Sequence, residues 1–193
     1  MITGSVVALV TPMLESGGVD WRGLERLIDW HIGSGTDVIS LVGTTGEAST
    51  LSHEEHREVI RIGVAHAGGR IPIMAGTGSN STTEAIELTV AAAEAGADSG
   101  LIVTPYYNRP TQEGMFQHFK AIAASVNLPI ILYNVPSRTA SDLSNETVLR
   151  LSQIENIVGL KDATGDVARA RDLMALLPDG FGVYSGDDAT TCD

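Results

Sequence analysis

Cysteine and positive charge are both scarce in this 193-residue chain. Its single cysteine, Cys192, cannot form a disulfide within the chain, and nothing indicates thiol chemistry or an oxidising compartment. Twelve lysines and arginines stand against 24 aspartates and glutamates, which gives a formal net charge of −12. This acidity disfavours nucleic acid and anionic membrane surfaces as partners. An anionic substrate would have to be held by a few local Arg or Lys side chains.

Long hydrophobic runs are also missing. The first apolar run, residues 6–10, is far shorter than the roughly 18 residues of a membrane span, and no basic segment precedes it. We therefore expect a cytoplasmic protein that has no membrane partner. Hydrophobic residues make up 43% of the chain, which is enough to build a substantial core. One globular domain over residues 1–193 is predicted.

Short apolar segments recur along the chain at a spacing of roughly 30 residues, the length of one strand–helix unit. They begin near Ser5, Val38, Ile71, Leu101, Ile130, Ile157 and Val183. Several of them, such as residues 130–132, are apolar throughout rather than alternating, which is typical of parallel strands covered on both faces. Segments with helical spacing separate these strands, so an α/β fold is predicted.

Helix boundaries carry their own signals. Ser52 with Glu55, and Ser81 with Glu84, match the capping box, in which two side chains bond the first free backbone N–H groups of a helix. Glycines such as Gly68 follow the apolar stripes and predict where helices end.

Polar residues follow nearly every predicted strand, and this favours a (βα)8 barrel over an open sheet. An open doubly wound sheet binds ligands at one switch point, whereas every strand end can contribute in a barrel. The polar segments are residues 43–47, 76–78, 104–108 and 133–138, and Lys161. Only seven strands can be counted, and barrels typically take ~250 residues. We expect a TIM barrel truncated after strand seven, with the C-terminal strand and helices absent.

Lys161 directly follows an entirely apolar strand, where its ammonium would be poorly solvated. Desolvation lowers a lysine pKa, and a neutral amine can attack a ketone to form a Schiff base. A lysine at a strand end more often simply reaches solvent. However, Tyr133 and Arg138 follow the preceding strand, and Thr44 and Thr45 lie between two glycines. These side chains could supply proton transfer and carboxylate binding, so together they predict a Schiff-base site.

Three motifs resemble those of the dihydrodipicolinate synthase family: GTTGE at 43–47, YNVPSRT at 133–139 and GLKDATG at 159–165. The similarity begins at Thr3 and continues to Asp188, so it covers nearly the whole chain. The resemblance implies a lyase of the class I aldolase type that condenses pyruvate with L-aspartate 4-semialdehyde. The product would be 4-hydroxy-2,3,4,5-tetrahydrodipicolinate, in lysine biosynthesis through diaminopimelate.

The resemblance also implies a role for each site residue. Lys161 would form the imine with pyruvate, and Tyr133 would transfer a proton. Thr44 would relay that proton to Tyr107, which a neighbouring subunit of a homotetramer supplies in this family. The substrates would be bound by Thr45, which holds the pyruvate carboxylate, by Arg138, which holds the carboxylate of the semialdehyde, and by Gly186.

Two alternatives stay open. Sugar-acid lyases of the same superfamily keep a lysine, a tyrosine and a glycine-rich turn, although Arg138 within residues 136–139 favours the lysine-pathway enzyme. The truncated chain could instead be catalytically inert, because a parallel barrel that lacks one strand leaves unpaired strand edges and uncovered apolar surface.

A second group of polar residues lies away from the strand ends. His53 and His56 are three residues apart, which is not the H-E-x-x-H spacing of zinc proteases, so no metal is predicted and a solvated helix face is the common explanation. The resemblance adds L-lysine as a feedback inhibitor, bound at Ala48, Ser49, His53, His56, Asn80, Glu84 and Tyr106. The glycine-rich turns lack nucleotide-binding patterns and imine chemistry needs no cofactor, so none is expected.

Overall fold

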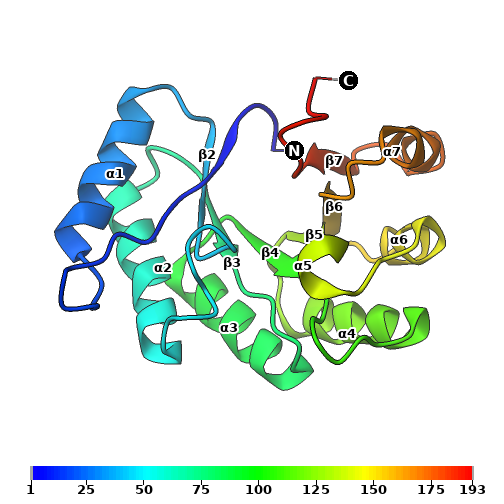
Figure 1. Cartoon of the computed structure of the whole chain (residues 1–193), viewed down its shortest axis with the longest axis horizontal. Helices are drawn as coiled ribbons and strands as arrows, with labels where there is room; N and C mark the ends of the chain where they lie inside the picture. The colour runs from blue at the N-terminus through cyan, green and yellow to red at the C-terminus, as the bar shows by residue number, and fades with distance from the viewer. Residues whose placement is uncertain (1, 193) are drawn as a thin grey trace. The chain divides into compact units, whose positions relative to one another are not determined.

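The computed structural model describes residues 2–192, in which strands and helices alternate (Figure 1). The strands are β1 (Val6–Ala8), β2 (Val38–Leu41), β3 (Ile73–Gly76), β4 (Ser99–Val103), β5 (Ile130–Asn134), β6 (Ile157–Asp162) and β7 (Gly182–Ser185). The helices are α1 (Trp21–Gly33), α2 (His53–Ala67), α3 (Thr82–Ala95), α4 (Gln112–Ser125), α5 (Pro136–Thr139), α6 (Asn145–Leu151) and α7 (Val167–Met174). Each predicted strand start lies within two residues of the observed one.

The described residues divide into two compact units, and the division falls within α3 and β4. The first, called here the N-unit, contains residues 2–77 and 88–101. The second, called here the C-unit, contains residues 78–87 and 102–192.

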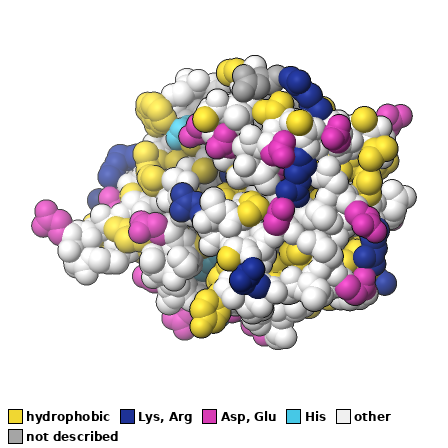
Figure 2. Space-filling view, turned by 45° about the vertical axis from the view of Figure 1, so that its right-hand side comes forward, with side chains coloured by type: hydrophobic (Ala, Val, Ile, Leu, Met, Phe, Trp, Pro, Cys, Tyr) yellow, Lys and Arg dark blue, Asp and Glu magenta, His cyan; other side chains and the backbone are white. Residues whose placement is uncertain are grey.

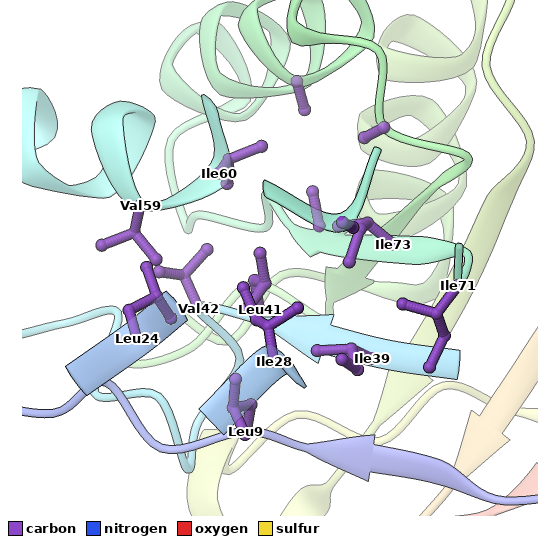
Figure 3. Close-up of a cluster of buried hydrophobic side chains, with 14 of the residues drawn as sticks. Leu9, Leu24, Ile28, Ile39, Leu41, Val42, Val59, Ile60, Ile71 and Ile73 are labelled. Carbon is purple, nitrogen blue, oxygen red and sulfur yellow. The ribbon is translucent and has the colours of Figure 1, made fainter. Parts of the chain in front are cut away.

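In the N-unit, β1 to β3 and the first residues of β4 pair in parallel and in sequence order. All four residues of both β2 and β3 are buried, as their apolar sequences predict. Side chains from these strands, from α1 and α2 and from the loops between them form one apolar cluster (Figure 3). Its labelled members are Leu9, Leu24, Ile28, Ile39, Leu41, Val42, Val59, Ile60, Ile71 and Ile73.

In the C-unit, the end of β4 and strands β5, β6 and β7 continue the parallel order. Helices α4, α6 and α7 lie side by side along this part of the sheet (Figure 1). The apolar core includes Phe119 and Ile122 from α4 and Ile130 and Leu132 from β5, none of which is exposed. The register places Tyr133 of β5 opposite Lys161 of β6.

Every strand is parallel to the next one in the sequence, and helices lie between them. This order, β1 to β7 without reversal, is that of a (βα)8 barrel and not that of a doubly wound sheet. The predicted α/β class is confirmed, and the seven strands of the described residues follow the order of a TIM barrel, as predicted. The prediction of a single domain over residues 1–193 stays a prediction.

The predicted capping box of α2 is present: Glu55 N donates to Ser52 Oγ at 3.2 Å, and Ser52 N donates to the Glu55 carboxylate at 2.9 Å. At the start of α3, Glu84 N donates to Ser81 Oγ at 3.4 Å, while Ser81 N donates to Ser79 Oγ. Gly68 ends α2 in the left-handed conformation, as predicted.

Charges of both signs are mixed on the surface face that Figure 2 shows. Asp and Glu side chains lie among Lys and Arg side chains, so this face carries no uniformly basic patch. No helix within residues 2–192 combines the length and the apolar character that crossing a bilayer would require.

Gly76, the last residue of β3, lies directly against the backbone at the end of β2. A Cβ atom at this position would overlap the carbonyl oxygen of Val42 and would lie 2.8 Å from its carbonyl carbon and 3.0 Å from Gly43 N. Val42 itself has φ +46°, an unusual value for a β-branched residue. The end of β3 therefore fixes the turn that follows β2.

We predict that Gly76→Ala lowers the free energy of unfolding by about 1–3 kcal/mol or more, because its Cβ would meet backbone rather than a movable side chain. Gly33→Ala is the matched control, since a Cβ at Gly33 meets nothing within 4 Å and α1 gains alanine for glycine. Urea unfolding followed by circular dichroism measures both. Equal midpoints for the two variants would contradict the close approach at Gly76.

Candidate active site

Lys161 lies one residue before the end of β6, between Tyr133 on β5 and Tyr184 on β7. Its Nζ is 4.6 Å from the centroid of the Tyr133 ring. Burial lowers the pKa of Lys161 from the ordinary value of 10.5, although the charge of Asp188 acts in the opposite direction. The neutral, nucleophilic amine is therefore available at a lower pH than in an exposed lysine.

Gly186, just after β7, lies against the stem of Lys161. Its N–H donates to the carbonyl of Asp162 at 2.7 Å. A Cβ on Gly186 would come within 2.8 Å of Lys161 Cε and 3.1 Å of Ala163 Cβ. The missing side chain is what leaves space for the lysine, so the predicted site residue Gly186 is located next to Lys161.

Tyr133 is buried at the end of β5, and its carbonyl accepts a hydrogen bond from Thr104 N at 2.9 Å. The loop after β4 carries Tyr107, which has φ +72° and a residue exposure of 91%. Tyr107 N donates to the carbonyl of Thr139 at 3.3 Å. The backbone of this exposed tyrosine is thus fixed on α5, although its ring extends into solvent.

Arg138 is exposed on α5, a single helical turn that is followed by Ala140 in the left-handed conformation. Proline at the first helical position suits the start of a helix, because its missing N–H would have no partner there. Within residues 2–192, no Asp or Glu side chain forms an ion pair with the Arg138 guanidinium. It is therefore a local cation available to an anionic ligand, as the charge balance of the sequence requires.

Thr44 and Thr45 are both exposed on the turn after β2, in the N-unit. The turn is closed by the bond from Glu47 N to the Thr44 carbonyl at 3.1 Å. It is also held from the segment that follows β1, because the buried hydroxyl of Thr11 donates to the carbonyl of Gly46 at 2.7 Å. The turn presents two hydroxyl groups on a well-supported backbone.

Five of the predicted catalytic and substrate-binding residues belong to the C-unit, whereas Thr44 and Thr45 belong to the N-unit. Lys161, Tyr133 and Gly186 lie at the ends of neighbouring strands, and Arg138 follows Tyr133 by five residues. Tyr107 belongs to the same unit.

Two side chains that sequence reasoning missed connect these elements. Thr104 and Thr139 are buried, and their hydroxyl groups are 3.3 Å apart. The Thr139 hydroxyl oxygen also lies 3.1 Å from the Val135 carbonyl oxygen and 2.9 Å from that of Ser141, and these two carbonyls share its single hydrogen. The contact links the end of β4 to α5. The sequence signals for them were the polar segment 104–108, which contains Thr104, and the YNVPSRT motif, which contains Thr139.

The residues predicted to bind L-lysine are divided between the two units. Ala48, Ser49, His53 and His56 belong to the N-unit, and Asn80, Glu84 and Tyr106 to the C-unit. In the C-unit, Asn80 Nδ2 donates to the carbonyl of Tyr106 at 3.2 Å, so these two lie together. Glu84 lies in the first turn of α3.

His56 differs from His53 in its environment. His53 is exposed, whereas His56 is buried and its Nε2 lies 2.7 Å from the carbonyl oxygen of Gly76. A solvated helix face was therefore the wrong explanation for His56. In the part of the chain that the structure describes, no three His, Cys, Asp or Glu side chains are grouped so as to hold a metal ion.

Comparison with known proteins gives consistent results. The model of the dihydrodipicolinate synthetase family matches residues 1–193. The 4-hydroxy-tetrahydrodipicolinate synthase of Herminiimonas arsenicoxydans is 63% identical over 190 residues, which is 98% of this chain and 65% of that protein. The chain therefore spans about two thirds of the length of this curated relative.

Two solved structures are also similar. One is the chloride-inhibited dihydrodipicolinate synthase from Acinetobacter baumannii complexed with pyruvate, with a TM-score of 0.97 and 63% identity over 99% of this chain and 66% of that one. The other is the enzyme from Cyanidioschyzon merolae with lysine bound, with a TM-score of 0.95 and 41% identity over 97% of this chain and 64% of that one.

We predict that Lys161 titrates at a lower pH in the folded chain than in the urea-unfolded chain, because burial disfavours its charged form. The chain has only two lysines, Lys120 and Lys161, so NMR of ¹³C-dimethylated protein gives two side-chain signals. The Lys161→Ala variant identifies the signal of interest. A folded-state midpoint equal to or above the unfolded one would contradict the environment described here.

Proposed function

The chain belongs to the dihydrodipicolinate synthetase family, and on that basis we propose that it has 4-hydroxy-tetrahydrodipicolinate synthase activity. The reaction is the condensation of pyruvate with L-aspartate 4-semialdehyde through a Schiff base. The observation that carries the proposal is the half-buried amine of Lys161, which has a lowered pKa and lies against Tyr133 and Gly186 at the strand ends.

The first step is imine formation. The neutral Lys161 Nζ attacks the carbonyl carbon of pyruvate, and the carbonyl oxygen leaves as water. Tyr133, whose ring packs beside Nζ, is placed to give the proton that this leaving group needs. Thr45 would bind the pyruvate carboxylate through its hydroxyl and backbone, while Thr44 would relay protons to Tyr107.

The second step forms the carbon–carbon bond. The imine loses a proton from the pyruvate methyl group and becomes an enamine, which attacks the aldehyde carbon of the semialdehyde. The exposed Arg138 guanidinium, which forms no ion pair within residues 2–192, would hold the semialdehyde carboxylate. The substrate's amino group then attacks the imine carbon and releases Lys161, which closes the ring of 4-hydroxy-2,3,4,5-tetrahydrodipicolinate. The lysine imine supplies the electron sink, so the reaction as proposed needs no cofactor.

We also propose that the protein is located in the cytoplasm, that it assembles as a homotetramer, and that L-lysine inhibits its activity. A homotetramer would let the exposed Tyr107 of one subunit complete the proton relay of its neighbour, and the high exposure of this ring within one chain supports that role. L-Lysine would act as a feedback inhibitor, for which Glu84 offers a carboxylate that could meet an ammonium group. The lysine-bound relative from Cyanidioschyzon merolae supports this part of the proposal.

Pyruvate followed by borohydride is expected to leave a reduced, covalent adduct on Lys161, located by peptide mapping and intact mass. The Lys161→Ala variant should show no adduct. Lys120→Ala is the matched control, because it removes the exposed lysine and should retain the full adduct. An adduct that survives Lys161→Ala, or that forms on Lys120, would contradict the proposed nucleophile.

Tyr133→Phe is expected to reduce kcat for the condensation by roughly 10²–10⁴, because it removes the proton donor but keeps the ring beside Lys161. Tyr184→Phe is the control, since that ring lies over Gly159 and Gly182, on the N-terminal side of Lys161. Steady-state kinetics with both substrates measures the difference. If the two variants lost activity equally, the proton role of Tyr133 would be wrong.

A further inference from the structure

The loop that carries Arg138 is held at its turn by the buried Thr139 side chain and farther along by contacts with its return segment. It leaves β5 after Asn134, forms the single turn α5, and returns through residues 140–144 to α6. One isolated helical turn is unstable on its own, because it fixes several backbone dihedral angles for very few hydrogen bonds. The position of Arg138 therefore depends on the bonds of Thr139 and also on what holds the return segment at Asp142 and Leu143.

Asn134 holds the return segment from the end of β5. Its side chain is buried, with a residue exposure of 1%. Its Nδ2 donates to Asp142 Oδ1 at 2.9 Å, and its Oδ1 accepts from Leu143 N at 3.0 Å. One amide thus closes the loop between the residue next to Tyr133 and the residues that precede α6.

Arg169 holds the same segment from α7, the helix that follows β6. Its Nη1 is 2.9 and 2.8 Å from the two carboxylate oxygens of Asp142, and its Nη2 donates to the Leu143 carbonyl. Its Nε donates to Asn145 Oδ1 at 3.2 Å. Burial by itself raises the pKa of Asp142, but the hydrogen bonds from Arg169 and Asn134 outweigh it and lower the pKa below 3.8.

Gln112 is the third support and comes from the first residue of α4. Its Nε2 donates to the Asp142 carbonyl at 2.7 Å, and its Oε1 accepts from Ser144 N at 3.1 Å and from the Thr147 hydroxyl at 2.7 Å. Backbone and side-chain groups of residues 142–144 are therefore satisfied by three elements at once.

We propose that Asn134, Gln112 and Arg169 form a clamp that positions Arg138 for the second substrate without contacting that substrate. The inference rests on the proposed function, in which Arg138 binds the semialdehyde carboxylate. Arg169 fixes the orientation of Asp142 and Leu143, because a planar guanidinium can bond both carboxylate oxygens and a carbonyl at once. Lys161 and Tyr133 lie on strands, so pyruvate capture does not depend on this loop.

The test is Arg169→Lys, which keeps the positive charge but loses the fork of hydrogen bonds. We expect the KM for L-aspartate 4-semialdehyde to rise about tenfold, while the KM for pyruvate and the borohydride-trapped adduct stay within about twofold. Asp142→Asn should raise the same KM, and the double variant should raise it by less than the product of the two single-variant factors, as expected for partners in one contact.

Arg150→Lys is the matched control. Arg150 also pairs with a carboxylate in the C-unit, Glu113, at 2.8 Å, and its guanidinium lies 4.0 Å from the Phe116 ring centroid. Its side chain is not among the partners described above for Asn134, Gln112 and Arg169. This variant should leave both KM values unchanged. An unchanged semialdehyde KM in Arg169→Lys, or an equal loss of pyruvate trapping, would overturn the clamp as a positioning device.

Hydrogen–deuterium exchange separates this inference from the proposed function. Arg169→Lys should speed exchange in residues 135–143, and Arg150→Lys should not. If the unmodified chain traps no pyruvate, the proposed function fails, and the exchange result then decides whether the clamp holds the loop. Unchanged exchange in Arg169→Lys would overturn it.

Discussion

The register between β5 and β6 is the constraint on which the candidate site depends. Ile130 pairs with Ile157, but Ile131 pairs with Gly159, so the bulge inserts Val158 as an extra residue. Without that shift, Tyr133 would lie opposite Leu160 instead of Lys161. Successive side chains on a strand point to opposite faces, so a slip of one residue would move the tyrosine away from the amine.

The candidate site residues lie on two kinds of element, strand ends and loops, and different contacts fix their positions in each. Lys161 and Tyr133 project from strands whose neighbours are buried, so their positions follow from the packing of the sheet. Arg138 and Tyr107 project from loops and depend on hydrogen bonds that reach across the chain, through Thr139 and through the clamp on Asp142. Precise placement on a loop requires this second layer of polar contacts.

Burial, and not the acidity of the chain, favours a neutral nucleophile at Lys161, because nearby negative charge such as that of Asp188 stabilises the ammonium form. A buried ammonium would need a well-placed counter-ion, whereas burial of Lys161 lowers its pKa and makes the amine available for attack. Two arginine side chains of the C-unit have different roles. Arg169 is committed to Asp142, while the Arg138 guanidinium is available in the described part of the chain to bind a substrate carboxylate.

Local patterns determined much of this protein. The apolar runs fixed the strands, the capping box at Ser52 fixed the start of α2, and the position of Lys161 after a strand marked the site, because each signal involves neighbours in sequence. Tertiary structure alone decided the bulge at Val158, the burial of His56 and the clamp around Asp142. These features join residues far apart in the sequence, and their geometry exists only when the strands and helices have packed.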